Sequence, residues 1–341
     1  MKLLIIGSDK VFSIENFYYK YLIELGVDTK RFTAQAIFYD YYFSGNILRK
    51  IIFKLGLSSI HKKINNQFKE IVDDFKPDII WVFKGMEITP ESLKWAKSKG
   101  IKLINYNPDN PFIFTGKGSG NANVTDSIGL YDFHFTYNLE IQKQLQQQYN
   151  AKTDFLPFAF DVSKELFDEC SKEDEIVKAC FLGNPDKIRS AFLEQLASKG
   201  IEIDVFGNDW DKFVTHKNIT THMPVYSNEQ WKTLRKYRVQ INLMRIHNED
   251  SHNMRTFEVP GIGGLQVAPN TKEHQLFFEE GKEIFLYKDI DECVTKINYL
   301  LSLSKEQANE FRTLSNNAAI NKKYSYKDRT FQVYNVLKSF V

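Results

Sequence analysis

Residues 253–287, NMRTFEVPGIGGLQVAPNTKEHQLFFEEGKEIFLY, hold the pattern from which the fold is inferred. Arg255 and Glu258 are three residues apart, so a helix presents both on one face, where they can project into one cleft. Pro260 and the glycines after it should end that helix, since proline lacks a backbone donor and glycine tolerates positive φ. Residues 265–268 follow as a short buried strand. The stretch therefore predicts a helix, a glycine turn and a strand.

The Arg255 and Glu258 pair fits two interpretations. A guanidinium can hold phosphate in a planar fork, and a carboxylate can accept hydrogen bonds from the hydroxyls of a sugar or ribose. The same spacing fits an ordinary ion pair on the surface of an amphipathic helix. Spacing alone leaves both interpretations open.

Apolar runs alternate with amphipathic stretches along the chain, as in βα units built around parallel sheets. The first half predicts strands at 3–6, 31–37, 79–83, 102–105, 134–137 and 154–156. The second half predicts strands at 179–182, 203–206, 240–243, 265–267 and 284–286, then helices at about 290–302, 305–321 and 326–339. An α/β protein with two Rossmann-like halves follows, and 341 residues suffice for two such cores.

Several segments together carry a family resemblance. Arg255-Thr-Phe-Glu258 with its glycine turn, Leu276-Phe277, Gly281-Lys-Glu283-Ile284 and Tyr287 resemble the C-terminal domain of the CgeB-like (spore maturation protein) glycosyltransferases of the GT-B fold. Phe181-Leu-Gly183 followed by Arg189, Phe206-Gly207-Asn-Asp-Trp210 and Tyr324-Ser-Tyr326-Lys-Asp-Arg329 fit the same family. The resemblance spans most of residues 176–335. Before residue 150 only Tyr106-Asn-Pro-Asp109-Asn-Pro111 is similar to the family, in its acidic-proline turn.

Two positions depart from the family pattern. Tyr324 stands where a His-Thr-Tyr opening is usual. Gln266 stands where many related retaining enzymes have a second Glu, eight residues after the first. The second departure leaves the ribose contact undefined.

The resemblance implies a fold and an activity. The expected fold is GT-B, with an acceptor-side Rossmann-like domain at 1–160 and a nucleotide-sugar-binding Rossmann-like domain at 161–325. The two domains would face each other across a cleft, and a helix at 326–341 would return to the first domain. The expected activity is transfer of a sugar from a nucleotide-diphosphate-sugar donor to a saccharide, glycan or lipid-linked acceptor, without a metal or another cofactor.

Candidate donor contacts lie in loops that follow predicted strands, because open α/β sheets bind ligands beyond the carboxyl ends of their strands. Residues 183–187 open a helix whose backbone N–H groups, with Lys187 or Arg189, would neutralise a diphosphate. The alternative is an Asx-Pro helix start with solvated charges. The indole of Trp210 would stack on the nucleotide base or line one side of its pocket. The full expected donor-binding set is Gly183, Asn184, Trp210, Asn253, Thr256, Glu258, Gly263 and Gly264, with Arg189 and Arg255 stabilising the leaving diphosphate.

The acceptor side offers proton-handling candidates. Asp109 follows a predicted strand and would be the general base of an inverting reaction. Its alternative is an Asx turn between two prolines. The histidines His61, His134, His247 and His252 are further candidates, although a lone histidine is usually a structural residue.

Other motifs indicate no metal or dinucleotide chemistry. Asp209-Trp-Asp211 spells D-x-D, the metal motif of the other large glycosyltransferase fold, but it falls within the second of two sheets. Gly7-Ser-Asp-Lys10 lacks the G-x-G-x-x-G fingerprint, and Gly116-Lys-Gly-Ser-Gly120 lacks the P-loop spacing and fits a loop or lid.

Composition and charge limit the possible binding partners and the cellular location of the protein. A net charge of +2 argues against nucleic acid as a partner. The three cysteines fit no disulfide or zinc pattern, and no apolar run is long enough for a signal peptide or a membrane span, which favours a cytoplasmic protein. The family resemblance implies a bacterial one. Residues 39–63 mix aromatic, aliphatic and cationic side chains. They fit peripheral contact with the inner face of a membrane, or a helix with a core-facing side and a basic solvent side.

Two other functions remain open from the sequence. A sugar-nucleotide epimerase would use the same pair of Rossmann-like domains without an acceptor. A non-catalytic binding protein could retain the fold alone, since fold does not fix function.

Overall fold

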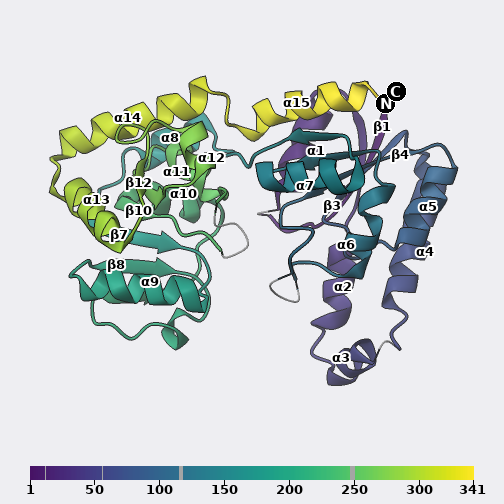
Figure 1. Cartoon of the computed structure of the whole chain (residues 1–341), viewed down its shortest axis with the longest axis horizontal. Helices are drawn as coiled ribbons and strands as arrows, with labels where there is room; N and C mark the ends of the chain where they lie inside the picture. Colours follow the sequence, from purple (N-terminus) through teal and green to yellow (C-terminus); the bar gives the residue numbers. More distant parts are fainter. Residues whose placement is uncertain (12, 56, 115–117, 246–249) are drawn as a thin grey trace. The chain divides into compact units, whose positions relative to one another are not determined.

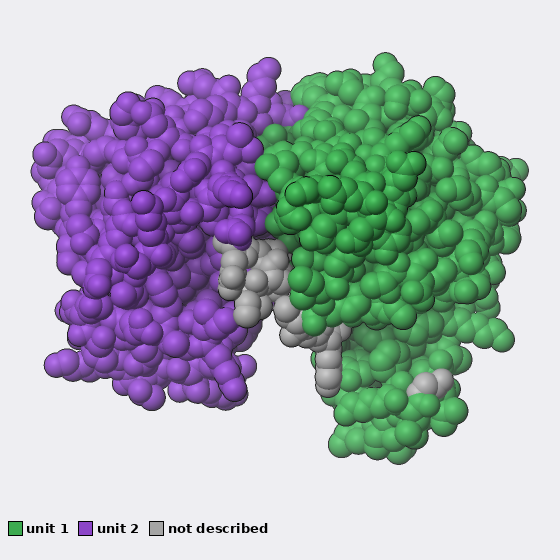
Figure 2. Space-filling model, in the orientation of Figure 1, with its two compact units in different colours: residues 1–157, 329–341 green, residues 158–328 purple. Residues whose placement is uncertain are grey.

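The computed structural model describes residues 1–341 apart from 12, 56, 115–117 and 246–249. The chain forms two compact units (Figures 1 and 2). Unit 1, green in Figure 2, contains Met1–Pro157 and Arg329–Val341, and unit 2, purple, contains Phe158–Asp328. The chain therefore leaves unit 1 once and returns to it in its last helix.

Unit 1 is built on a parallel sheet with the strand order β2-β1-β3-β4-β5-β6. The central strand β3 has the sequence IIWVF and is buried along its whole length, as expected for a parallel strand covered on both faces. The strands are β1 (Lys2–Ile6), β2 (Asp28–Phe32), β3 (Ile79–Phe83), β4 (Lys102–Asn107), β5 (Phe133–Thr136) and β6 (Thr153–Phe155).

Helices cover the sheet of unit 1, and one apolar core packs beneath Ile64, Phe68 and Leu93. Ile64 and Phe68 lie at helical spacing on α4, which is followed by Lys76 in a left-handed conformation with φ of 51°, whereas Leu93 lies on α5. The helices are α1 (Ile14–Glu24), α2 (Ala34–Tyr42), α3 (Ile47–Lys54), α4 (Ile60–Phe75), α5 (Pro90–Ser98), α6 (Ala122–Ser127), η1 (Ile128–Leu130), α7 (Leu139–Tyr149) and α15 (Tyr326–Lys338).

Unit 2 contains a second parallel sheet, with the order β12-β11-β10-β7-β8-β9. Its central strand β10 is buried throughout and pairs with β7 and β11. The strands are β7 (Ile176–Leu182), β8 (Ile203–Phe206), β9 (Ile219–His222), β10 (Tyr237–Ile241), β11 (Gln266–Pro269) and β12 (Phe285–Tyr287).

Several helices of unit 2 begin at a residue whose side chain caps the helix. Ser304 and Gln307 form a reciprocal capping box at the start of α14, and Asp289 caps α13. The helices are α8 (Lys164–Cys170), α9 (Lys187–Ser198), η2 (Trp210–Lys212), α10 (Ser227–Lys236), α11 (Arg255–Gly261), α12 (Lys272–Phe277), α13 (Ile290–Ser302) and α14 (Lys305–Asn321). The predicted α/β architecture with two Rossmann-like halves is confirmed.

Two strand predictions need correction, and both concern edge strands. The strand predicted at 31–37 is wrong, because β2 ends at Phe32 and α2 begins at Ala34. The β9 strand, Ile-Thr-Thr-His, was not predicted. Edge strands are exposed on one side, so β2 and β9 carry polar residues and lack the apolar run by which inner strands are recognised.

The helix, turn and strand predicted in residues 253–287 are confirmed as α11 and β11. Pro260 lies inside α11 and does not end it. The helix ends at the glycines instead: Gly263 has a φ of +73°, and a Cβ on Gly264 would lie 2.8 Å from the carbonyl oxygen of Leu234. The three cysteines are free thiols in buried positions, as expected for small apolar side chains.

Candidate active site

The carboxyl ends of the strands of unit 2 all lie at one edge of the sheet, because every pairing in it is parallel. Open α/β sheets bind ligands at this edge. The loops found there follow β7, β8, β10 and β11, and they begin with Gly183, Gly207, Asn242 and Asn270. Most of the predicted donor residues belong to these loops or to the helices that follow them.

Arg189 ties two of these loops together. Its guanidinium donates from Nη2 to the carbonyl oxygen of Leu243 at 3.0 Å and from Nη1 to that of Asn184 at 3.3 Å. The residue is only 9% exposed. Arg189 on α9 therefore lies between the loop after β7 and the loop after β10.

The start of α9 is already capped by a carboxylate. Asp186 accepts hydrogen bonds from the backbone N–H groups of Ile188 at 3.1 Å and Arg189 at 2.9 Å. These N–H groups are therefore not free for a diphosphate, and the alternative of an Asx-Pro helix start describes this turn. Lys187 is exposed, so the buried cation of this loop is Arg189.

Arg255 and Glu258 form an ion pair on α11. The Glu258 side chain is 6% exposed and the Arg255 side chain 25%. The second carboxylate oxygen of Glu258 accepts a hydrogen bond from Gln230 Nε2 at 3.3 Å. The carboxylate thus lies beneath its arginine, and Arg255 is the more accessible member of the pair.

Gln266 has a structural role in this arrangement. Its side-chain nitrogen donates to the backbone carbonyl oxygen of Arg255 at 2.7 Å, and the residue is 3% exposed. It joins β11 to the first turn of α11. The position where related enzymes have a second acid therefore holds the helix to the sheet in this chain.

Both arginines are electrostatically strained. Burial, with a smaller contribution from the neighbouring cation Arg245, lowers the pKa of Arg189 to about 10. Burial also lowers the pKa of Arg255 to about 10, and the charge of Arg189 contributes in the same direction. Both groups remain charged at neutral pH. Two cations that disfavour each other at one sheet edge would be stabilised by a bound anion.

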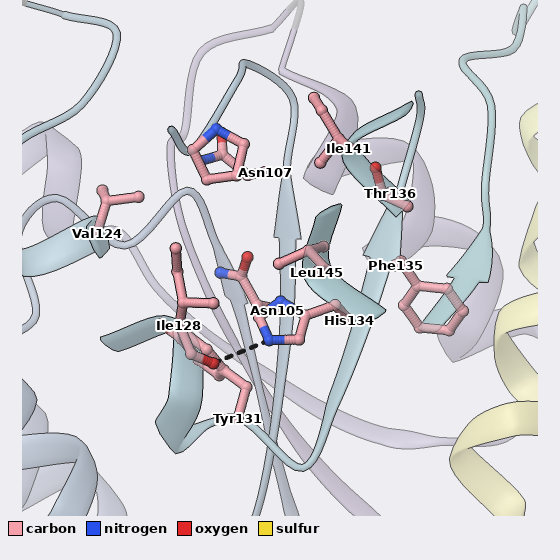
Figure 3. A pocket seen from close by; sticks show the side chains of 11 residues that line it. Asn105, Asn107, Val124, Ile128, Tyr131, His134, Phe135, Thr136, Ile141 and Leu145 are labelled. Carbon is pink, nitrogen blue, oxygen red and sulfur yellow. Dashed lines mark hydrogen bonds between the residues drawn. The ribbon is translucent and has the colours of Figure 1, made fainter. Parts of the chain in front are cut away.

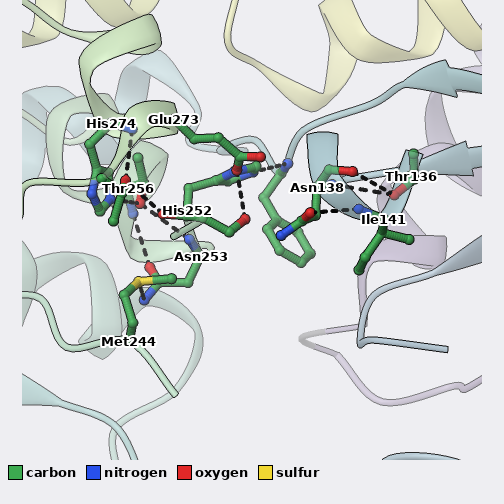
Figure 4. A network of polar contacts seen from close by, with 12 residues as sticks. Thr136, Asn138, Ile141, Met244, His252, Asn253, Thr256, Glu273 and His274 are labelled. Atoms are coloured by element: carbon green, nitrogen blue, oxygen red, sulfur yellow. Dashed lines mark hydrogen bonds and ion pairs between the residues drawn. The ribbon is translucent and has the colours of Figure 1, made fainter. Parts of the chain in front are cut away.

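A network of polar side chains fixes the start of α11 (Figure 4). The Asn253 amide donates to Asn242 Oδ1 at 2.6 Å, and its backbone N–H donates to Thr256 Oγ1 at 3.3 Å. Thr256 Oγ1 lies 2.9 Å from His274 Nε2, and His274 Nδ1 lies 2.8 Å from the Pro269 carbonyl oxygen. His274 must donate through Nδ1 to that carbonyl, so its Nε2 accepts from Thr256. Thr256 is fully buried and supports the site from below.

His252 is a structural histidine. Its Nε2 accepts the backbone N–H of Phe158 at 3.2 Å, so Nδ1 donates to Glu273 Oε2 at 2.6 Å (Figure 4). Ser251 Oγ also donates to this carboxylate at 2.6 Å. Both ring nitrogens are occupied within the protein, which leaves no free lone pair for a proton from a substrate.

Trp210 supports the loops rather than presenting its ring to a base. It is 1% exposed, packs in the core of unit 2, and donates from Nε1 to the carbonyl oxygen of Gly183 at 2.8 Å. Asn184 Oδ1 accepts the backbone N–H of Asn208 at 3.1 Å. The stacking role predicted for Trp210 does not fit this burial, whereas the exposed residues of the Gly183–Asn184 turn remain at the edge.

Gly263 and Gly264 lie away from the candidate site. The α11 helix begins after the carboxyl end of β10 and runs back to the start of β11, so its glycine turn is at the amino edge of the sheet. The two glycines therefore do not contact the candidate donor site. They form a turn that packs against Leu234 and Phe167.

The D-x-D segment shows no metal-binding arrangement. Asp209 pairs with Lys212 at 2.6 Å, and Trp210 between the two acids is buried. Across the described ranges, no three His, Cys, Asp or Glu side chains are grouped as metal ligands.

Asp109 lies at the carboxyl edge of the unit 1 sheet, after β4. Its Oδ2 is 2.6 Å from Lys84 Nζ, and its backbone N–H donates to Asn107 Oδ1 at 3.0 Å. The predicted Asx turn is therefore present together with an ion pair. Lys84, which follows β3 and has a φ of +62°, was not singled out from the sequence.

Two buried carboxyl groups accompany Lys84 in unit 1. Glu87 is 7% exposed and Glu15 is 6% exposed. The pKa of Glu87 is raised to about 7, mainly by burial. The negative charge of Glu15 contributes to this increase, and the positive charge of Lys84 acts against it. Burial also raises the pKa of Glu15, whose Oε1 accepts the Ser8 N–H at 2.5 Å. Glu87 lies in the loop that follows β3, so the rule that ligands bind beyond strand ends would have identified it.

The remaining histidine candidates do not form an exposed site. His134 Nε2 is 3.0 Å from the Ile128 carbonyl oxygen, and burial lowers the pKa of His134 to about 4 (Figure 3). The cavity beside it, lined also by Asn105 and Asn107, has a volume of about 10 Å³, enough for about one water molecule and far too small for a sugar. Burial also lowers the pKa of His61. His247 and residues 115–117 of the proposed lid lie outside the described residues.

Comparison with known proteins agrees with this geometry. Residues 189–335 match the family model described as Glycosyl transferase-like. No curated protein sequence matches the chain. The matched range contains Arg189, Arg255 and the network that positions α11.

Solved structures share the fold over nearly the whole chain. A glycosyltransferase from Rickettsia africae is 13% identical, with a TM-score of 0.67 and coverage of 99% of this chain and 98% of that one. Sucrose-phosphate synthase from Thermosynechococcus elongatus is 8% identical, with a TM-score of 0.66 and the same two coverages. Anabaena HepE, solved with UDP-glucose, is 13% identical, with a TM-score of 0.64 and coverage of 99% and 100%.

The protein is therefore an α/β protein of the GT-B fold, and residues 189–335, most of them in unit 2, are similar to the Glycosyl transferase-like family. The fold expected from the sequence is confirmed, and the family match supports the expected glycosyltransferase.

Proposed function

We propose that this protein transfers a sugar from a nucleotide-diphosphate-sugar donor to a saccharide, glycan or lipid-linked acceptor. The observation that carries the proposal is the pair of guanidinium groups, Arg189 and Arg255, at the carboxyl edge of the unit 2 sheet. Each is disfavoured by burial and by a neighbouring cation, so each would gain from a bound diphosphate. The donor is the one substrate of such a transfer that always carries this anion.

The chemistry assigns a task to each group. As the bond between the anomeric carbon and the diphosphate oxygen breaks, negative charge grows on the leaving diphosphate, and Arg189 and Arg255 would stabilise it. The oxygen of an acceptor hydroxyl forms the new bond and loses its proton. Asp109 is the proposed base if the reaction inverts the anomeric centre, supported by its place after the carboxyl end of β4.

Glu258 and Gln266 act on Arg255 in this proposal. Glu258 lies beneath the guanidinium and is nearly buried, so it positions Arg255 rather than meeting donor hydroxyls directly. Gln266 holds the backbone of Arg255 to β11. Gly183 and Asn184 line the nucleotide side.

We further propose that transfer needs no metal, because arginines supply the positive charge that a divalent ion would supply. Turnover in excess EDTA should equal turnover in Mg²⁺. A strict requirement for Mg²⁺ or Mn²⁺ would contradict this part of the proposal.

The narrower CgeB-like assignment is also a proposal. It is supported by residues of the motif that the fold uses: Phe257 and Phe277 pack edge-on, with their ring centres 4.9 Å apart. Because Anabaena HepE is solved with UDP-glucose, uridine nucleotides are the first donors to test.

The primary test is a thermal-shift panel of nucleoside diphosphates and nucleotide sugars. A ligand that binds only the folded state raises the melting temperature by mass action. We expect one nucleotide class to stabilise the wild type and Arg189→Met to lose that stabilisation, whereas Lys199→Gln, at the far end of α9, should retain it. Absence of stabilisation by every nucleotide would overturn the proposal.

Product analysis separates the alternatives. Release of nucleoside diphosphate that depends on an acceptor indicates transfer. An isomerised nucleotide sugar formed without acceptor would indicate an epimerase, and donor binding without any turnover would indicate a binding protein.

Peripheral membrane contact through residues 39–63 is a separate proposal, since no donor-site residue lies in that range. Such contact would bring the enzyme to a lipid-linked acceptor.

A further inference from the structure

The segment from Tyr41 to Lys69 is strongly basic. It contains six lysines and arginines and no aspartate or glutamate, in a chain whose net charge is only +2. The cations are Arg49, Lys50, Lys54, Lys62, Lys63 and Lys69. Positive charge is thus concentrated in one part of unit 1.

The α3 helix at the centre of this segment is attached to unit 1 by one main contact. None of its residues is buried. Phe53 packs at 5.2 to 5.8 Å, between ring centres, against Phe38, Tyr42 and His61. In Figure 1, α3 lies at the end of α2 and α4 that points away from the unit 1 strands.

The outer face of α3 is apolar. At about 100° per residue, five apolar side chains fall within an arc of about 140° whose centre lies opposite Phe53. They are between 40% and 71% exposed, and they are Ile47, Leu48, Ile51, Ile52 and Leu55. Phe43 and Leu57, beside the helix, are also exposed. A helix that packs one half-buried phenylalanine against its unit and exposes five aliphatic side chains needs a further partner.

Cations border this apolar arc on both sides. On the same helical projection, Lys50 and Lys54 flank Ile47, and Arg49 flanks Ile52. Lys50 Nζ lies 5.7 Å from the ring centre of Phe43, and the Arg49 guanidinium lies 5.5 Å from that of Tyr41. Apolar residues between cations and aromatic rings are the composition of helices that lie in a membrane interface.

We propose that α3 and the described residues beside it, 43–55 and 57–63, dock on the surface of a lipid bilayer that contains anionic lipids. The aliphatic arc enters the boundary between head groups and acyl chains, and the lysines and arginines contact the lipid phosphates. A second copy of the chain is a poorer occupant, because it would bring a second basic surface against the first. No described helix is long and apolar enough to span a bilayer, so the contact is peripheral.

The first test measures binding of the full chain to vesicles. Wild type should float with vesicles of phosphatidylcholine and phosphatidylglycerol at 3:1, and bind vesicles of phosphatidylcholine alone at least about tenfold more weakly. Raising the salt concentration should weaken binding to the mixed vesicles. No binding to the mixed vesicles would overturn the proposal.

Two double variants separate the apolar and the cationic contributions. Ile51→Gln with Leu55→Gln, and Lys50→Gln with Lys54→Gln, should each reduce the partition coefficient about tenfold or more. Ile51, Lys54 and Leu55 are exposed and Lys50 is half-buried, so folding should be unaffected, as circular dichroism can verify. The matched control is Leu314→Gln with Lys305→Gln, on α14, which should bind like wild type. Equal binding by all three variants would also overturn the proposal.

A probe on α3 locates the contact. All three native cysteines are buried, so Leu48→Cys can be labelled selectively with an environment-sensitive dye. Its emission should rise and shift to the blue on mixed vesicles, whereas a dye at Leu314→Cys should not respond. If both dyes stay unchanged while the protein floats, or if the α3 dye responds to protein concentration without vesicles, the surface is not a lipid contact. Donor-induced thermal shifts, measured in the same samples, report separately on the glycosyltransferase proposal.

Discussion

Glu258 lies beneath Arg255 on α11, with its carboxylate 6% exposed and the paired guanidinium 25% exposed. The pair therefore has a direction: arginine faces the sheet edge and glutamate faces the protein. A surface ion pair would leave both groups in water. The difference assigns the two residues separate tasks, which substitution can distinguish.

We predict that Glu258→Gln weakens binding of a nucleoside diphosphate and of the corresponding nucleotide sugar equally, by about tenfold, because it releases Arg255 from its position. Calorimetric titration of both ligands measures this. A loss confined to the nucleotide sugar would show instead that Glu258 touches the sugar. Glu258→Ala should also lower the free energy of unfolding, by roughly 1–3 kcal/mol, since it leaves a partly buried arginine unpaired.

Arg189→Lys should reduce both stability and donor affinity. Lysine cannot reach the carbonyl oxygens of Asn184 and Leu243 together, and an unsatisfied buried carbonyl costs roughly 1–3 kcal/mol. Urea unfolding and calorimetric titration are the measurements. Lys187→Gln, two residues away and exposed, is the control. A larger loss of affinity in that control than in Arg189→Lys would identify Lys187 as the phosphate ligand.

Glu87 should make unit 1 less stable as pH rises. Its pKa is raised from 4.5 to about 7 in the folded state, so folding retains a proton that the unfolded chain has released. The stabilising contribution is complete below pH 4.5 and is lost as pH rises through 7. Between pH 4.5 and 8, wild type should lose roughly 3 kcal/mol relative to Glu87→Gln. Denaturant unfolding at several pH values measures this loss.

Glu24→Gln, at an exposed carboxylate of unit 1, should show the same pH dependence as wild type. If Glu87→Gln also retained that dependence, the carboxyl group of Glu87 would have to be ionised in the folded protein at neutral pH.

Gly261→Ala should destabilise unit 2. The added Cβ would lie 2.5 Å from Cγ of Phe160, closer than carbon atoms pack, and overpacking of this kind costs roughly 1–3 kcal/mol. The melting temperature reports the change. Gly129→Ala is the matched control, since its Cβ would meet only Tyr149 Cδ1 at 3.7 Å. Equal melting temperatures for wild type and Gly261→Ala would mean that Phe160 moves aside without cost.

The inner strands β1 and β3 could be predicted from sequence because they are apolar runs, whereas Arg238 and Gln240 interrupt β10, whose predicted range of 240–243 overlaps it only in part. Ile79–Phe83 is buried at every residue, and such a run has few alternatives in an α/β chain. The edge strand β9 could not be predicted, because its threonines face solvent and its pairing depends on a single neighbour, β8. Residues 33–37 were wrongly predicted as part of a strand, because their apolar residues alone do not distinguish a strand from the start of a helix.

The candidate site was only partly predictable for a similar reason. Spacing placed Arg255 and Glu258 on one face, and strand ends identified Gly183 and Arg189. Spacing could not show which member of a pair is covered, nor that Trp210 turns into the core. Gln230 contributes to the site through its hydrogen bond to Glu258, and Asn242 through its hydrogen bond to Asn253. Each bond joins segments that are distant in sequence, so no local pattern reveals it.

The segments by which the chain enters and leaves unit 2 are hydrogen-bonded to each other. The Phe160 N–H donates to the Tyr324 carbonyl oxygen at 3.2 Å, and the Tyr326 N–H donates to the Phe160 carbonyl oxygen at 2.9 Å. Unit 2 is therefore an insertion whose two ends are neighbours. Residues 158–328 are therefore one continuous insertion, and we expect that the equivalent segment of a relative can replace them while both chain segments of unit 1, Met1–Pro157 and Arg329–Val341, are kept. Under the proposed function, such a replacement would change the donor and keep the acceptor.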